Sequence, residues 1–279
     1  MTAPDPSTPV PSGRIEKLSD GYALAFDRQF DYPTAYIWDV LTAPAKVAAW
    51  LGRLSPGWEQ GSAYRLDRQG TEVTGTVLQM NPRSSLQLTW EDDLGDESVV
   101  EWQVLDSEGG ALLSFRARSD GADFLTEGAA GWQDILDAFA SVAAGGQPGT
   151  GFALDTWLAL RDAYAEEFGI SPTMGTLHGD TILFERWFDA GAREATEAIN
   201  DSTATLAIGA GAEVEVDDTA DGSRAVVRQP LPAGGGDAPA LLAAWHMALD
   251  DAALRLQGGT PHADSRRLAA LRSFYGGVD

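Results

Sequence analysis

The histidines are the first residues to examine for metal binding or acid–base chemistry. The chain has three of them, His178, His246 and His262. None has a second histidine four residues away or a neighbouring Glu-x-x-His, the spacing on which zinc sites and metalloproteases rely. His178 stands in a predicted solvated loop, and His246 follows Trp245 on a predicted helix, where it faces solvent or a carboxylate. The spacing therefore predicts no metal site.

Carboxylates are abundant, but their spacing does not predict a catalytic pair. Asp92, Asp93, Asp96 and Glu97 gather in one predicted turn, whereas acid–base catalysis needs two carboxylates in unlike environments inside a cleft. The run 217–222 comes nearer to a calcium loop but lacks the terminal Glu that completes such a shell. Without cysteine or a Gly-x-Ser-x-Gly motif, the chain has no thiolate chemistry, no disulfide and no usual serine platform. We therefore predict no cofactor and assign no catalytic residue.

The charge balance limits the partners. The chain has 19 Lys and Arg against 42 Asp and Glu, a formal net charge of −23, which argues against nucleic acid and anionic membranes as partners. No apolar run approaches the roughly 18 residues that span a membrane, and the N-terminus has no signal-peptide core. We expect a cytoplasmic protein with a Pro- and Ser-rich disordered tail over residues 1–14. Hydrophobic content of 44% with nine tryptophans supplies a packed core.

The middle of the first half alternates apolar and polar residues, as strands with one buried face do. The alternating runs are Tyr64–Leu66, Val73–Val77, Leu86–Trp90, Val100–Val104 and Leu113–Ala117. Turn formers such as Gly70, Pro82 and Gly109 separate them. A strand over Tyr22–Asp31 and two short helices, beginning near Pro33 and Pro44, precede the runs. Such an antiparallel meander needs a cover on its apolar side.

The predicted cover is one long helix. Trp132, Leu136 and Phe139 mark a single helical stripe, and Gly145-Gly146 ends it. The order of elements predicts an α+β fold over residues 15–146, in which a curved antiparallel sheet is wrapped on its C-terminal helix.

These motifs, taken in order, resemble the START-like (SRPBCC) superfamily. The resemblance is carried by Asp31-Tyr32-Pro33 to Trp50-Leu51, Gly75-Thr76-Val77, Leu86 to Trp90, and Gly131-Trp132 to Leu136. More narrowly, the segment 20–146 is similar to the branch named after the C-terminal domain of the heat-shock protein 90 ATPase activator. Ala43 stands where that branch usually has an acidic helix cap. The resemblance implies a helix-grip fold whose space between sheet and helix often holds a ligand.

The large side chains of these elements would enclose that space. We predict that an apolar or aromatic small molecule binds there, against Tyr64, Leu88, Trp90, Trp102, Phe115, Trp132 and Leu136. The alternative is that the same rings simply fill the space. The predicted function is therefore binding of a hydrophobic small molecule, with a stress-related role suggested by the family name. Two other functions stay open: a cyclase- or hydrolase-type enzyme using the same cavity, and a chaperone-associated module.

The second half of the chain repeats parts of the first, after a linker with a helix over 147–180. FERWFD at Phe184–Asp189 echoes FDRQFD at Phe26–Asp31, 158 residues earlier, and Ala243–Gly259 echoes Ala130–Gly146, 113 residues earlier. We therefore predict that 181–279 is a degenerate second helix-grip unit with a sheet of about three strands. The alternative is an unrelated α+β extension whose amphipathic helices merely look alike.

A repeat of this kind predicts which side chains are buried. Those expected to pack between the second long helix and its small sheet are Trp245, Leu249, Leu256, Phe184 and Val226. Asp250 and Arg255 are expected to face solvent. Because so narrow a sheet encloses little space, this unit is predicted to be solid and structural.

Overall fold

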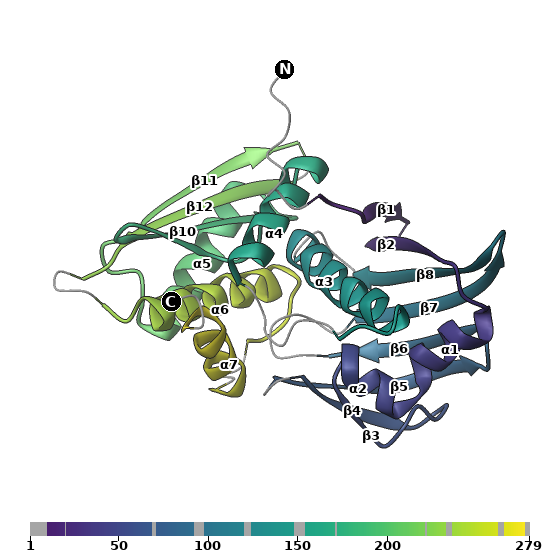
Figure 1. The fold of residues 1–279 in the computed structure, drawn as a ribbon. Coiled ribbons are helices and arrows are strands. Elements are labelled where there is room, and N and C mark those ends of the chain that lie inside the picture. The colour runs from purple at the N-terminus through teal and green to yellow at the C-terminus, as the bar shows by residue number, and fades with distance from the viewer. Residues whose placement is uncertain are drawn as a thin grey trace. The chain divides into compact units, whose positions relative to one another are not determined.

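The computed structural model describes most of the chain in two compact units, residues 1–170 and 171–279, called here the first and second units (Figure 1). The described residues are 10–19, 21–68, 71–91, 98–119, 124–147, 154–170, 172–220, 222–232, 236–261 and 265–276. The acidic turn at 92–97 and His262 lie outside them.

The first unit is an eight-stranded antiparallel sheet that holds a long helix. Its strands are β1 (Arg14–Leu18), β2 (Gly21–Phe30), β3 (Arg53–Ser55), β4 (Ala63–Arg68), β5 (Thr71–Asn81), β6 (Ser85–Trp90), β7 (Ser98–Ser107) and β8 (Gly110–Ser119). They lie in the order β1-β2-β8-β7-β6-β5-β4-β3. Its helices are α1 (Thr34–Thr42), α2 (Pro44–Trp50), α3 (Leu125–Ala143) and α4 (Leu154–Phe168). This is the predicted α+β helix-grip architecture.

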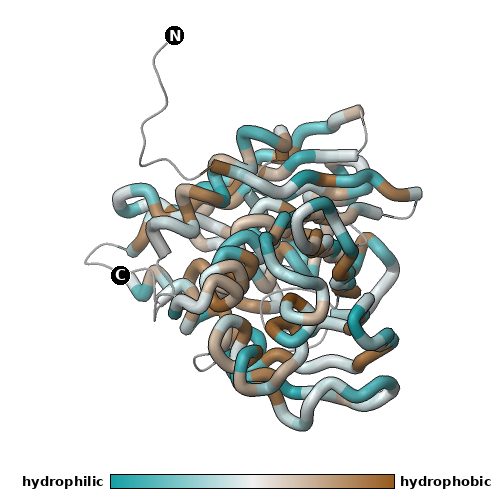
Figure 2. The backbone as a smooth tube through the Cα atoms, turned by 45° about the vertical axis from the view of Figure 1, so that its right-hand side comes forward, coloured by the Kyte–Doolittle hydropathy of each residue, from teal (hydrophilic) through white to brown (hydrophobic). Residues whose placement is uncertain are grey.

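Alternation along the strands places the core between the sheet and α3. Along β6, every second residue is buried, and the α3 stripe of Trp132, Leu136 and Phe139 is buried against the sheet. The same alternation of apolar and polar residues runs along the chain in Figure 2. One wet and one dry face per strand leaves the apolar face to be covered, and α3 supplies that cover.

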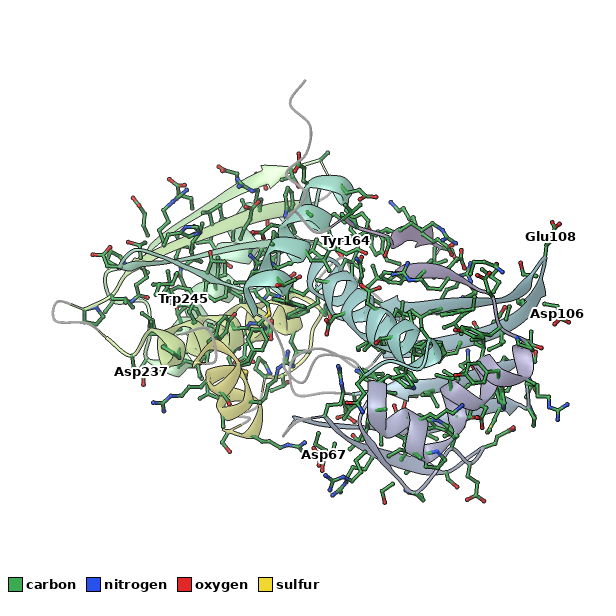
Figure 3. The ribbon with its side chains drawn as sticks, viewed as in Figure 1. Asp67, Asp106, Glu108, Tyr164, Asp237 and Trp245 are labelled. Carbon is green, nitrogen blue, oxygen red and sulfur yellow. The ribbon has the colours of Figure 1, made fainter. Side chains whose placement is uncertain are left out.

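The predicted tail over 1–14 is too long, because residues 10–14 are held in the fold. The amides of Ser12 and Gly13 donate to the hydroxyl of Tyr164, over 3.1 and 2.9 Å, and Arg14 begins β1. Tyr164 lies on α4, which the sequence analysis placed in a linker and which packs on α3 inside the first unit (Figure 3). Residues 148–153 of that linker lie outside the described chain.

The second unit has a smaller sheet with three helices. Its elements are β9 (Thr176–His178), β10 (Thr181–Phe188), α5 (Ala192–Leu206), β11 (Glu213–Thr219), β12 (Gly222–Pro230), α6 (Ala238–Leu256) and α7 (Ser265–Gly276). Its strands lie in the order β11-β12-β10-β9. The sheet has four strands rather than about three, because the segment around His178, predicted as loop, pairs with β10 as β9.

The second sheet reproduces the β1-β2-β8-β7 half of the first. The strand before the first helix pairs with the strand before the long helix in both: β2 with β8, and β10 with β12. The following hairpins close in the same register, with Ser107 opposite Gly110 in one and Thr219 opposite Gly222 in the other. The fold is therefore a helix-grip domain followed by a smaller domain of similar topology, which in its described residues lacks equivalents of α2 and of β3 to β6.

Two glycines explain why the hairpin ends alike in both units. A Cβ added to Gly110 would lie 2.0 Å from the carbonyl oxygen of Phe30, and one added to Gly222 would lie 2.1 Å from that of Phe188. No side chain fits at either distance, so glycine lets the hairpin close against the end of the neighbouring strand.

Most of the predicted burial in the second unit is confirmed. Trp245, Leu249 and Phe184 are at most 1% exposed. Val226 is buried too, but it lies on the opposite sheet face, because Val227 is the residue paired with Phe184.

Three of the burial predictions for α6 are wrong. Leu256 is only half-buried. The Asp250 side chain is 17% exposed, because two guanidinium groups bind it inside the unit. Arg255 is half-buried and donates to the Ser202 hydroxyl over 3.2 Å.

Candidate functional site

The seven predicted site residues are all buried in the first unit. Their exposed fractions run from 0% for Phe115 and Leu136 to 7% for Trp132. Four of their rings form one cluster between the sheet and α3: Trp90, Trp102, Phe115 and Trp132. This group is called the aromatic cluster below.

Strand register and the α3 stripe assemble the aromatic cluster. Trp102 and Phe115 are paired across β7 and β8, with ring centroids 4.4 Å apart. Trp132 approaches from α3, 4.4 Å from Phe115 and 4.8 Å from Trp90. At these separations the rings touch one another. The cluster therefore fills much of the space that a ligand would take.

Two further rings extend the cluster, and the sequence analysis left them out of the site. Trp50, at the end of α2, lies 5.6 Å from Trp102 and 5.0 Å from Phe139. Its indole N–H donates to the carbonyl of Val40 over 3.0 Å. Phe139 stands on the same helical stripe as Trp132, so its periodicity could have assigned it to the site. Trp50 has a weaker signal, the i, i+3, i+4 spacing of Val47, Trp50 and Leu51 on one short helix, all of which are buried.

The four rings of the cluster are not buried to the same degree. Trp90 and Trp132 are 6% and 7% exposed, whereas Trp102 and Phe115 are at most 1% exposed. The Trp90–Trp132 pair, called the rim of the cluster below, is therefore the less buried half of these four rings.

The surroundings of the aromatic cluster are apolar. The buried neighbours that alternation places on the same sheet face are Val77, Leu86, Val100, Val104 and Leu113. The buried carboxylate of α3, Glu127, lies five residues before Trp132, which is about 140° around the helix and away from the sheet. It accepts a hydrogen bond from Thr126 over 2.8 Å. No group suited to acid–base catalysis is thus directed at the rings from the described part of α3.

Tyr64 stands apart from the other predicted site residues. Its ring packs on Trp58, with centroids 5.0 Å apart, and its hydroxyl donates to the Thr89 carbonyl over 2.7 Å. Burial raises the pKa of Tyr64. It borders a solvent-open hollow of about 470 Å³, whose other lining residues include Thr74 and Glu91. Tyr64 therefore belongs to the edge of the sheet rather than to the aromatic cluster.

The second unit has a buried polar cluster on α6 instead. His246 is 0% exposed; its Nδ1 lies 3.0 Å from the Tyr275 hydroxyl and its Nε2 lies 3.4 Å from an Asp250 oxygen. Arg186 and Arg267 bind the same carboxylate over 2.9 and 2.7 Å. These five residues are called the His246 cluster.

The charges of the His246 cluster explain its protonation. Burial lowers the pKa of His246 to about 4, although Asp250 acts in the opposite direction. Burial alone would raise the pKa of Asp250, but His246, Arg186 and Arg267 outweigh it and hold that pKa below its usual range. A neutral imidazole that accepts from the Tyr275 hydroxyl at Nδ1, with Nε2 3.4 Å from the Asp250 carboxylate, fits these neighbours. The prediction that His246 faces a carboxylate is confirmed, and the alternative of solvent is wrong.

The first unit holds the counterpart of this cluster without a histidine. Gln133 occupies the place of His246 and accepts a hydrogen bond from Tyr164. Arg28 binds Asp137 over 3.2 Å, as Arg186 binds Asp250. The polar cluster is therefore part of the repeated framework.

A second hollow, of about 680 Å³, lies between the start of α5 and the end of α6. Its lining includes Ala190 and Glu194, where the first unit has Tyr32 and Tyr36. In the first unit those rings lie 5.1 Å apart, and the Tyr36 hydroxyl donates to the carbonyl at the end of α3. The hollow thus lies where the first unit has two tyrosine rings. Within the described residues, no group of three or more potential metal ligands is close enough to hold an ion.

Comparison with known proteins bears on the first unit above all. Residues 31–144 match the family described as activator of Hsp90 ATPase homolog 1-like protein. No curated protein matches the chain. None of the described helices is long and apolar enough to cross a membrane.

Several solved structures are similar to the chain. CalU16 from Micromonospora echinospora is 19% identical with a TM-score of 0.46, over 56% of this chain and 95% of its own. DynU16, from the dynemicin biosynthetic locus, is 18% identical with a TM-score of 0.44, over 86% of this chain and 98% of its own. A Rhodobacter sphaeroides protein is 23% identical with a TM-score of 0.39, over 48% of this chain and 96% of its own.

Proposed function

Because the first unit is a START-like domain resembling the activator of Hsp90 ATPase, we propose that it binds a hydrophobic small molecule between its sheet and α3. The observation that carries the proposal is the aromatic cluster, which lines this space with large rings and apolar neighbours. Small-molecule sites are mostly apolar and contain few polar groups. The ligand class that fits is flat, uncharged and aromatic or apolar, since each ring of the cluster offers a face or an edge for stacking.

Binding requires the rings at the rim of the cluster to move. Trp90 and Trp132 touch each other at a centroid separation of 4.8 Å, and they are the less buried pair of the cluster. A ligand that rotates this pair apart would reach Trp102 and Phe115 without disturbing the sheet register. We expect slow association and a change in tryptophan emission, because the ligand replaces contacts between indole rings.

The same apolar surroundings favour a binding protein over an enzyme. A cyclase or hydrolase working in this space would need an acid or base directed into it. Glu127, the buried carboxylate of α3, is on the far side of the helix. We therefore propose binding without catalysis for this unit.

Nile red, a neutral dye that fluoresces in apolar surroundings, tests the proposal. The wild-type protein should bind it saturably, and Trp132→Phe should bind it more tightly, because the smaller ring opens the rim. Trp245→Phe is the matched control, since Trp245 occupies the equivalent place in the second unit. Native mass spectrometry should show one dye molecule per chain.

Two results would overturn the proposal. One is the absence of saturable binding in both the wild type and Trp132→Phe, with circular dichroism showing both folded. The other is an equal response of Trp245→Phe, which would place the dye outside the aromatic cluster.

A further inference from the structure

The second unit ends its sheet at a strand that is central in the first unit. β11 is the counterpart of β7, because both form the same hairpin with the strand before the long helix. β7 pairs with β8 on one side and with β6 on the other. β11 pairs with β12, and within the described chain no strand pairs with its other edge. The framework that holds a further strand in one unit is therefore open in the other.

Alternate backbone N–H and C=O groups of β11 point away from β12, towards the open edge of the sheet. In a hairpin closed by a two-residue turn, alternate residues direct their N–H and C=O groups away from the partner strand. Val104 shows this in the first unit, where its amide donates to the Ser84 carbonyl over 2.8 Å, on the β6 side. Val216 holds the equivalent register position, opposite Ala225. Its amide thus points to the open edge.

The side chains of β11 indicate what could pair there. Val214, opposite Val227, is on the face that carries Phe184 and is 36% exposed. Its counterpart in the first unit, Trp102, is 1% exposed and packs against Trp50 of α2 and Trp132 of α3. The other face of β11 presents three exposed carboxylates, Glu213, Glu215 and Asp217, of which Glu215 also binds Arg228 of β12 over 2.9 Å.

We propose that the open edge of β11 binds an extended, basic segment of a partner protein, which adds to the sheet as β6 adds to β7. Backbone hydrogen bonds to the edge would supply affinity, and alternate side chains would supply specificity. Apolar side chains of the segment would cover Val214 and Val216. Lys or Arg side chains on its other face would meet the row of carboxylates.

The same row argues against a second copy of this chain as the occupant. Two β11 strands paired edge to edge would bring Glu213, Glu215 and Asp217 of both copies together, and like charges placed opposite each other are destabilising. Natural proteins use charged edge strands to prevent such pairing. β11 has no proline, so its backbone can still pair with a further strand. Its two valines lie on one face and its row of carboxylates lies on the other. The edge therefore disfavours a second β11 and favours a basic strand.

A fluorescein-labelled peptide of alternating lysine and valine, as long as β11, is the probe. Its anisotropy should rise saturably with the full-length protein. Glu213→Lys/Asp217→Lys should weaken its binding by about tenfold or more, since each lost surface ion pair contributes up to about 1 kcal/mol. Val216→Pro should abolish binding, because proline removes the outward N–H, and an edge strand tolerates it there.

Two controls separate strand addition from simple charge attraction. Glu101→Lys changes the residue equivalent to Glu213 in a strand that is paired on both sides, and it should leave binding unchanged. The same peptide with N-methylated alternate amides keeps its charge but should not bind. Equal binding of the methylated peptide, or an equal effect of Glu101→Lys, would overturn the proposal. So would sedimentation showing a dimer that Val216→Pro dissolves, which would assign the edge to a second copy.

Discussion

The two units share a framework but differ in what they enclose. Both dock the segment before their first strand on a tyrosine hydroxyl: Gly13 donates to Tyr164 over 2.9 Å and Gly175 to Tyr275 over 3.1 Å. The units differ at Trp102, which lies at the centre of the aromatic cluster of the first unit. Its counterpart in the second unit is Val214, which lies on the edge strand β11. Contacts that recur are those that the fold itself needs. The features that differ, the aromatic cluster and the open edge, are where separate functions can reside.

The two units also differ in the width of their sheets and in what covers the long helix of each. Eight strands curve around α3 and leave room for a cluster of rings, whereas four strands leave α6 to pack on α5 and α7 as well as on the sheet. In the second unit α6 is therefore buried by α5 and α7 as well as by rings of β10 such as Phe184, which lies 6.5 Å from the His246 ring. The small sheet is stabilised by packing against three helices. The wide sheet encloses the space in which we propose that a ligand binds.

The largest effect that tests this comparison is expected from Trp245→Ala. Trp245 is 1% exposed and its indole N–H donates to Gln229 over 2.5 Å. Truncating a buried tryptophan costs about 3–5 kcal/mol, so the second unit should unfold well before the first. Hydrogen exchange read by mass spectrometry would show the loss in peptides of 171–279 alone. Trp187→Ala is the control, because that side chain is 45% exposed and its loss should cost at most about 0.5 kcal/mol. Equal loss of protection in both units would mean that they do not fold separately.

Much of this architecture could be predicted from the sequence, since period-two and helical patterns report directly on burial. Alternation placed Leu88, Trp102 and Phe115 on a buried face, and the α3 stripe placed Trp132 opposite them. The patterns could not tell a filled interior from an empty one, because ring packing depends on how far the sheet curves and not on which residues face inward.

Three errors share a second cause, which is that polar contacts between distant segments leave no periodic signal. Asp250 looks like a solvent-facing position on a helix, yet Arg186 and Arg267 make it an interior one. Residues 10–14 look like tail until Tyr164, more than a hundred residues later, binds their backbone. The helix of 154–168 is tied to the first unit by the same polar contacts, because its Tyr164 binds the amides of Ser12 and Gly13, in addition to its packing on the preceding helix α3.

A smaller effect, confined to acid, is expected from His246→Gln. The unfolded chain protonates this histidine below about pH 6.5, while the folded unit keeps it neutral down to about 4. Its contribution is therefore fully present above pH 6.5, falls as the pH drops towards 4, and amounts to about 3 kcal/mol by linkage. Gln133 shows that glutamine can hold the tyrosine, so the variant should fold and lose this pH dependence.

The reverse change in the first unit is the control for that prediction. Gln133→His places an imidazole beside Tyr164 and Arg28, and should make the first unit less stable in acid over the same range. Asp250 titrates lower, since its pKa is held below the usual value of 3.8, so its effect lies outside this window. Thermal unfolding of each unit between pH 4 and 7, followed by hydrogen exchange, measures both variants. An unchanged slope in His246→Gln would show that another group controls the acid response.

The smallest effect is expected at Ala190 and Glu194, where the first unit has tyrosines. Ala190→Tyr/Glu194→Tyr restores the pair that Tyr32 and Tyr36 form in the first unit, and should raise the stability of the second unit by about 1 kcal/mol, the contribution of one aromatic pair. The new rings would fill the hollow between α5 and α6.

The direction of this change depends on whether the two units share their framework at this end. In the first unit, Tyr36 reaches the Ala143 carbonyl over 3.0 Å, and the second unit has Leu256 in that place. If the geometry is the same, a tyrosine at 194 finds a carbonyl to bind, and the removal of Glu194 also relieves repulsion among the carboxylates that line the hollow. The converse variant, Tyr32→Ala/Tyr36→Glu, should lower the stability of the first unit. A drop in the melting temperature of the second unit on adding the tyrosines would mean that α5 sits differently from α1, and that the repeat ends with the sheet.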